Sequence, residues 1–321
     1  MAKYHSVADL FRNRVQETPN LDAFQAPDGD DWRTYSWKDV DHEVRVIAAG
    51  LRDLGVEDGD RVAILCGTRI EWVFCDLGVN CAGAATTSIY PSTTPEDTQF
   101  IAGDSGSVII IVEDDAQVTK VTSQRENLPA VKHLVNLTGG GSDDGWVISF
   151  EDLKSKGAER LATQPEEIDQ IIDRIQSEDL ATLIYTSGTT GKPKGAQLVH
   201  DCWCYIAEAI VETGLMSSKD KQYLWLPMSH SFGKMLECVV IAVGCPTAID
   251  GRIPKIVENL AVIKPTFMAA APRIFEKVYN KVVTGAKGKG FPTSAIFKWA
   301  VGVGRKVSRL KQAGKEPAGL I

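Results

Sequence analysis

The chain has 321 residues, of which 44% are hydrophobic and 24% are charged, and its formal net charge is −7. This composition excludes a disordered chain, a collagen-like repeat and a coiled coil. The longest apolar stretch, Cys238–Cys245, is far shorter than the roughly 20 residues of a membrane-spanning helix. The first residues lack the apolar region of a secretion signal, so we expect a cytoplasmic protein.

The charge is distributed unevenly along the chain. Lys277–Lys315 contains ten basic and no acidic residues, whereas Met1–Glu276 contains 25 basic and 41 acidic residues, a net charge of −16. An acidic body argues against nucleic acid as a partner, because phosphate contacts require a basic face. The seven cysteines include no CxxC pair, which favours free thiols over a zinc or redox site.

Short β-branched runs alternate with helical patterns through most of the chain. They predict strands over Arg61–Cys66, Ala84–Ile89, Val108–Val112, Val131–Asn136, Leu180–Thr186, Gln222–Leu226, Pro246–Ile249 and Thr266–Ala270. The intervening segments predict helices over Trp37–Leu54, Ile70–Cys81, Thr94–Asp104, Trp203–Thr213 and Pro254–Ile263. This alternation is typical of an α/β fold with mostly parallel sheets flanked by helices.

A polar segment interrupts this alternation at residues 163–179, where Gln164–Glu167 opens a predicted helix. The segment could separate two sheet regions or form a surface helix. We favour a soft boundary there, within a single larger domain that includes residues 1–321.

The segment Thr186–Gly195 has the composition of a phosphate-binding loop. It follows a buried strand pattern and contains four hydroxyl side chains, three glycines and two lysines in ten residues. Glycines let backbone N–H groups approach a phosphate, hydroxyls donate hydrogen bonds, and lysines balance the charge. The segment is not a Walker A loop, because Gly188 and Gly191 are too close and Pro193 follows Lys192.

This loop resembles the signature of the AMP-forming adenylate synthetases, a superfamily that includes acyl-CoA synthetases, luciferases and adenylation domains of peptide synthetases. Further segments resemble the same superfamily in the same order: Gly55–Leu65, Gly83–Gly106, Leu226–Glu237 and Ala271–Val278. The sequences of Ile89–Pro91 and Pro272–Val278 are most similar to those of long-chain fatty acid–CoA ligases.

The resemblance implies an enzyme that activates a fatty acid with ATP, Mg²⁺ and CoA. The carboxylate attacks the α-phosphate to give acyl-AMP and pyrophosphate, and the thiol of CoA then displaces AMP. The phosphate-binding residues that it implies are Thr186, Ser187, Gly188, Thr189, Thr190, Gly191 and Lys194. It further implies that the Thr186 hydroxyl helps to hold Mg²⁺ and that Lys194 balances charge during catalysis.

His230 lies in the segment Leu226–Phe232. By resemblance, the residue at this position lies beside the reacting carboxylate and the α-phosphate, where an imidazole can orient one anion against the other. From the residues alone, the alternative is a structural histidine in the core.

The basic segment at residues 291–311 has apolar residues every three or four positions, with lysines and arginines between them. Such an amphipathic helix can lie on an anionic membrane surface, which would suit a fatty-acid substrate. The alternative is a helix that packs its apolar stripe on the domain.

Several segments of the superfamily do not occur in this chain, among them Tyr-Gly-x-Thr-Glu, Thr-Gly-Asp and the small C-terminal domain. We therefore expect an N-terminal part of a synthetase that performs the reaction poorly or not at all by itself. Two other interpretations stay open: an acyl-AMP ligase or adenylation domain that feeds a carrier protein, and a fragment that binds lipid or a partner chain.

Overall fold

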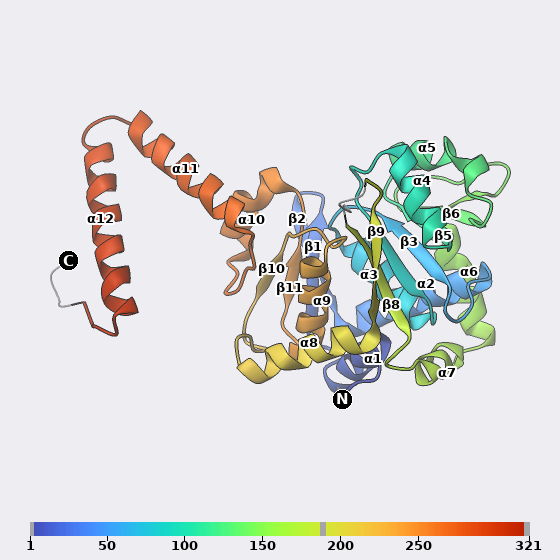
Figure 1. Cartoon of the computed structure of the whole chain (residues 1–321). Helices are drawn as coiled ribbons and strands as arrows, with labels where there is room; N and C mark the ends of the chain where they lie inside the picture. Colours follow the sequence, from blue (N-terminus) through green and yellow to red (C-terminus); the bar gives the residue numbers. More distant parts are fainter. Residues whose placement is uncertain (1–2, 187–190, 318–321) are drawn as a thin grey trace. The chain divides into compact units, whose positions relative to one another are not determined.

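The computed structural model describes residues 3–186 and 191–317 and divides into two units, Met1–Met268 and Ala269–Ile321 (Figure 1). We describe each unit by itself.

The first unit contains a seven-stranded sheet in the order β7-β6-β5-β3-β4-β8-β9. Its strands are β3 (Arg61–Leu65), β4 (Ala85–Ile89), β5 (Ser107–Val112), β6 (His133–Asn136), β7 (Val147–Ser149), β8 (Leu180–Thr186) and β9 (Lys194–Val199). Neighbouring strands are parallel except for β9, which pairs antiparallel with β8. The carboxyl ends of six parallel strands therefore meet at one edge of this sheet.

Helices cover both faces of the seven-stranded sheet. In β3, Ala63 and Leu65 pack in one core cluster with Ile101 of α4 (Pro95–Asp104) and Val121 of α5 (Asp115–Thr122). The alternate residues of the same strand are equally buried on the other face, as expected for a strand covered on both sides. There α2 (Trp37–Asp53) packs against α3 (Ile70–Cys81) and α6 (Phe150–Thr163).

A second, four-stranded sheet joins the beginning of the chain to its middle. Its order is β10-β11-β1-β2, with β1 (Asp22–Asp28), β2 (Asp31–Ser36), β10 (Gln222–Leu224) and β11 (Thr247–Ile249). Strand β11 is parallel to both β10 and β1, and β2 forms an antiparallel hairpin with β1. The helices α1 (Val7–Glu17), α8 (His200–Thr213) and α9 (Ser231–Val243) pack against one another, and α1 also contacts α3.

The remaining elements of the first unit are short. They are α7 (Glu167–Arg174), which leads from α6 to β8, α10 (Ile256–Ile263), and single 3₁₀ turns at Arg125–Asn127 and Ile253–Lys255.

The second unit consists of two helices, α11 (Pro272–Gly288) and α12 (Thr293–Gln312). Helix α12 has no buried residue, and large apolar side chains such as Phe275, Ile296 and Trp299 are more than half exposed. No helix in residues 3–186 or 191–317 combines the length and the apolar character that crossing a bilayer requires.

The predicted α/β class with parallel sheets flanked by helices is confirmed. One predicted strand, Thr266–Ala270, is wrong: in the structure only Phe267 pairs there, in a single bridge with Gln222. The reason is that β10 spans only three residues, so its free edge is too short to support a full neighbouring strand.

Candidate functional site

The predicted phosphate loop lies at the tip of the β8–β9 hairpin. Thr186, the last residue of β8, pairs directly with Lys194, the first residue of β9. Ser187, Gly188, Thr189 and Thr190 lie outside the described residues, and the second arm of the loop is described from Gly191 onward. Both Thr186 and Lys194 are exposed, so their side chains are accessible to a ligand at the carboxyl edge of the sheet.

Helix α4 holds both arms of this loop. On the first arm, the Tyr185 hydroxyl donates a hydrogen bond of 2.7 Å to Oδ2 of Asp104. On the second arm, the Lys192 ammonium lies 4.9 Å from the centre of the Phe100 ring, a cation–π contact. Burial and the neighbouring carboxylate raise the pKa of Tyr185, so the hydroxyl stays a donor at neutral pH. The sequence analysis missed Phe100 and Asp104, although their spacing of four residues on a predicted helix places them on one face.

His230 lies at the same edge of the sheet, at the beginning of α9. The turn that precedes it crosses the end of β4, where the Ser229 hydroxyl donates to the Ile89 carbonyl at 3.2 Å. The Ser88 hydroxyl is within 3.3 Å of the carbonyls of both Ser229 and Leu183, and so joins this turn to β8. Because β8 ends in the phosphate loop, the fold brings His230 and Thr186 to neighbouring strand ends. The His230 side chain is exposed, which contradicts the alternative of a core histidine.

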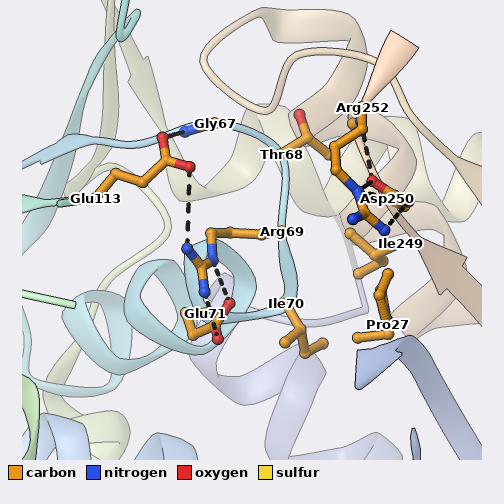
Figure 2. Close-up of a pocket in the computed structure, with 12 residues that line it drawn as sticks. Pro27, Gly67, Thr68, Arg69, Ile70, Glu71, Glu113, Ile249, Asp250 and Arg252 are labelled. Atoms are coloured by element: carbon orange, nitrogen blue, oxygen red, sulfur yellow. Dashed lines mark hydrogen bonds and ion pairs between the residues drawn. The ribbon is translucent and has the colours of Figure 1, made fainter. Parts of the chain in front are cut away.

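A cavity of about 380 Å³ opens beside this turn, at the carboxyl ends of β3, β5 and β11 (Figure 2). Thr68 links the two features, because its hydroxyl donates to the Leu226 carbonyl at 2.7 Å and accepts from the Met228 N–H at 3.2 Å. The lining combines apolar with charged side chains. The sequence contained no pattern that identifies this cavity, because its residues come from four distant segments.

The charged groups of this cavity are paired with one another. Figure 2 shows Arg69 with Glu71, at 2.6 Å, and Arg252 with Asp250, at 2.7 Å. Glu113 accepts a 2.9 Å hydrogen bond from the Gly67 N–H. With both guanidinium groups already neutralised by carboxylates, the cavity is poorly suited to phosphate, in contrast to the loop at the end of β8.

In the described part of the loop, residues 186 and 191–195, the Thr186 hydroxyl is the side-chain oxygen available to magnesium. Mg²⁺ is usually held by one or two protein ligands together with substrate phosphates and water. The exposed Thr186 hydroxyl fits the part of such a single ligand. Within the described residues, no three His, Cys, Asp or Glu side chains form a set that could hold a metal ion.

The described ends of the predicted loop and the exposed His230 lie at the carboxyl edge of a parallel sheet, the edge at which α/β proteins commonly bind ligands. A sequence profile described as AMP-binding enzyme matches residues 11–313. The chain therefore belongs to the AMP-binding enzyme family, and the resemblance found in the sequence is confirmed.

Similar proteins agree with this assignment. The long-chain-fatty-acid–CoA ligase FadD15 of Mycobacterium bovis is 29% identical over 90% of this chain and 47% of its own length. The human long-chain-fatty-acid–CoA ligase ACSBG2 is 29% identical over 97% and 47%. The chain thus spans about half the length of the curated relatives that it matches.

Solved structures share the fold. The anthranilate CoA ligase AuaEII in complex with anthranoyl-AMP superposes with a TM-score of 0.73 at 24% identity, over 85% of this chain and 51% of that one. The long-chain-fatty-acid-CoA ligase FadD1 from Archaeoglobus fulgidus gives a TM-score of 0.73 at 20% identity, over 90% and 55%.

Proposed function

We propose that this chain provides the phosphate-binding part of an enzyme that activates a long-chain fatty acid with ATP and transfers it to CoA. The observation that carries the proposal is the juxtaposition, at one sheet edge, of the Thr186–Lys194 loop ends and His230. The relatives that are named long-chain-fatty-acid–CoA ligases support the class of substrate.

In the proposed reaction a carboxylate oxygen bonds to the α-phosphorus of ATP while the bond to the bridging oxygen of pyrophosphate breaks. A thiolate sulfur then bonds to the acyl carbon, and AMP leaves with the electron pair of the acyl–oxygen bond. Bound Mg²⁺ would supply charge neutralisation at the phosphates, with the Thr186 hydroxyl as a protein ligand.

The chain's own residues bind and orient the two anions. The Lys194 ammonium, at the exposed beginning of β9, balances the charge of the phosphates. His230 donates a hydrogen bond that aligns the carboxylate with the α-phosphate. The main contribution of such a site to catalysis is to hold two anions in reacting geometry, because their mutual repulsion opposes their approach.

The test is exchange of labelled pyrophosphate into ATP, with palmitate as the carboxylic acid, together with calorimetric binding of Mg-ATP. We expect Thr186→Ala to lower Mg-ATP binding, and whatever exchange the unchanged chain catalyses, by at least tenfold. Thr213→Ala, which removes an exposed hydroxyl at the end of α8, serves as the control and should change neither. Absence of both exchange and ATP binding in the unchanged chain would contradict the proposal.

We also propose that residues 291–311 contact an anionic membrane surface. Ile296 and Trp299 are exposed by 60% and 64%, and the same helix, α12, also carries Lys298, Arg305 and Lys306. A helix with exposed apolar and basic side chains binds anionic lipid in two ways: the apolar side chains are buried in the membrane, and the basic side chains are attracted to the lipid charge. Sedimentation with phosphatidylglycerol vesicles should carry the chain down, and the double variant Ile296→Asp/Trp299→Asp should stay in solution. Equal sedimentation of both proteins would contradict this contact.

A further inference from the structure

The first turn of α9 is built around His230. Nδ1 of its ring accepts a hydrogen bond of 3.2 Å from the Phe232 N–H, so the side chain is the N-cap of the helix. The His230 carbonyl accepts from the Lys234 N–H at 3.1 Å and begins the helical ladder. The orientation of the imidazole is therefore fixed by the position of this one turn.

This cap determines which ring nitrogen can donate. An N-cap side chain must offer a lone pair, so Nδ1 of the neutral ring carries no proton. The proton of the neutral imidazole is then on Nε2. His230 can accordingly present an Nε2–H donor to a ligand while Nδ1 stays engaged with the helix.

A buried ion pair also holds the first turn of α9 in place. Lys234 is fully buried, and its Nζ is paired with Oδ2 of Asp76 on α3 and lies 3.1 Å from Oε2 of Glu237. Asp76 and Glu237 are also fully buried. Burial raises the pKa of Glu237 to about 8, so near neutral pH this carboxyl keeps its proton, and Lys234 and Asp76 balance each other.

Close packing against the preceding loop also fixes the first turn of α9. A Cβ atom at Gly233 would lie 2.2 Å from the Pro227 carbonyl oxygen, so the helix meets the preceding loop without space for any side chain. The first turn of α9 is thus held between this loop and the Lys234–Asp76 pair.

Stability alone does not explain such a pair. Removing two charges from water carries a penalty that their attraction barely offsets, and apolar residues of similar volume commonly replace buried pairs without loss. In some proteins a buried polar pair instead fixes the register between the elements that it joins.

We propose that the buried Lys234–Asp76 ion pair is a positioning device, which fixes the first turn of α9 so that His230 presents its Nε2–H to the anions at the carboxyl edge of the sheet. The proposal rests on the proposed function of this edge. Lys234 and Asp76 are positioning residues, because they act only through His230.

The test is a double-mutant cycle on binding of a palmitoyl-adenylate analogue whose phosphate is replaced by sulfamate. With the ion pair intact, His230→Asn should weaken binding about tenfold to a hundredfold, as expected for a hydrogen bond to a charged group. His230→Gln, whose amide reaches the Nε2 position, should recover part of the loss. In the charge-free variant Lys234→Met/Asp76→Leu, the same His230→Asn change should have almost no further effect.

A second measurement needs no ligand. Hydrogen exchange of the Phe232 amide, which donates to His230, should become roughly tenfold faster in the charge-free variant. The matched control, Arg45→Met/Asp169→Leu, removes another inter-helix ion pair, between α2 and α7, and should change neither the cycle nor this exchange rate.

The outcomes separate the two proposals. If the unchanged chain does not bind the analogue, the proposed function is contradicted, and the exchange rate of Phe232 still tests the positioning role. If the analogue binds and His230→Asn weakens this binding by the same factor with and without the ion pair, the positioning role is contradicted. Should the double variant not fold, Asp76→Asn, which keeps the volume and one acceptor oxygen, is tested by the same criteria.

Discussion

The proton on Glu237 makes stability depend on pH in a direction that can be measured. Its carboxyl has an ordinary pKa of 4.5, and burial raises this pKa to about 8 in the folded protein. Between these values the unfolded chain is ionised at Glu237 while the folded protein is not. The folded state therefore binds more protons, and the free energy of unfolding falls as the pH rises through this window.

A second buried group restricts where this fall is visible. His200 is buried with Nδ1 accepting from the Val7 N–H, and burial lowers its pKa from 6.5 to about 3. Below pH 6.5 His200 is protonated in the unfolded chain but stays neutral in the folded protein. The free energy of unfolding therefore falls as the pH falls. From pH 4.5 to 6.5 the two slopes oppose each other. Above pH 6.5 the opposing slope of His200 disappears within about one pH unit, and Glu237 dominates, at no more than about 1.4 kcal/mol per pH unit.

The expected result is a free energy of unfolding that declines by about 1–1.5 kcal/mol between pH 6.5 and pH 8. Urea denaturation at half-unit steps measures it. The range stops at pH 8 because burial raises the pKa of thiols such as Cys81, to about 12, and their ionisation in the unfolded chain would add a slope of the same sign above it.

Glu237→Gln provides the control, since the amide keeps the shape but cannot titrate. This variant should show a nearly flat profile from pH 6.5 to pH 8. Equal slopes in the two proteins would refute the reasoning, and a stability that increases over this range would mean that Glu237 is ionised in the folded state.

Three further predictions concern packing and the site. Gly157→Ala should lower the free energy of unfolding by about 3 kcal/mol or more, because its Cβ would lie 1.8 Å from a carbonyl oxygen of α2. The control is Gly285→Ala, which has open space around its Cβ and should raise helix stability slightly. Urea denaturation measures both changes. Thr68→Val should cost about 1–3 kcal/mol in the same assay, because it leaves the Leu226 carbonyl and the Met228 N–H without their partner. Tyr185→Phe should weaken Mg-ATP binding several-fold in calorimetry while changing stability by about 1 kcal/mol, because the first arm of the loop loses its hydrogen bond to α4; unchanged binding would contradict the role of α4.

The sequence predicted well those elements whose signal is local. The helix expected over Ile70–Cys81 has these bounds in the structure, and the buried runs of β3, β4, β5 and β8 lie within one residue of their predicted limits. Continuous apolar runs are unambiguous when both faces of a strand are covered.

The sequence analysis did not find the elements whose pairing is distant or whose pattern is polar. Strands β1 and β2 form a half-exposed hairpin, and β9 follows a loop that was read only for its chemistry. Helix α9 was missed although it begins at His230, because its apolar sequence also fits a buried strand. The loop and His230 were found by their motif, whereas Asp104, Thr68 and Lys234 reach the site only through tertiary contacts.

The pairing of β1 with β11 has a consequence for how the chain folds as it is synthesised. Phe24 pairs with Thr247, so the finished β1–β2 hairpin has a free edge until more than 200 further residues have been made. The N-terminal helix α1 also has late partners, since Arg14 donates to the carbonyls of Ile241 and Ala242 at 2.7 Å, in addition to its contacts with α3. All strands of the seven-stranded sheet are therefore synthesised before β11, and β1 gains its second partner strand only afterwards. A chaperone that recognises exposed strand edges could bind this edge of β1 until β11 has been made.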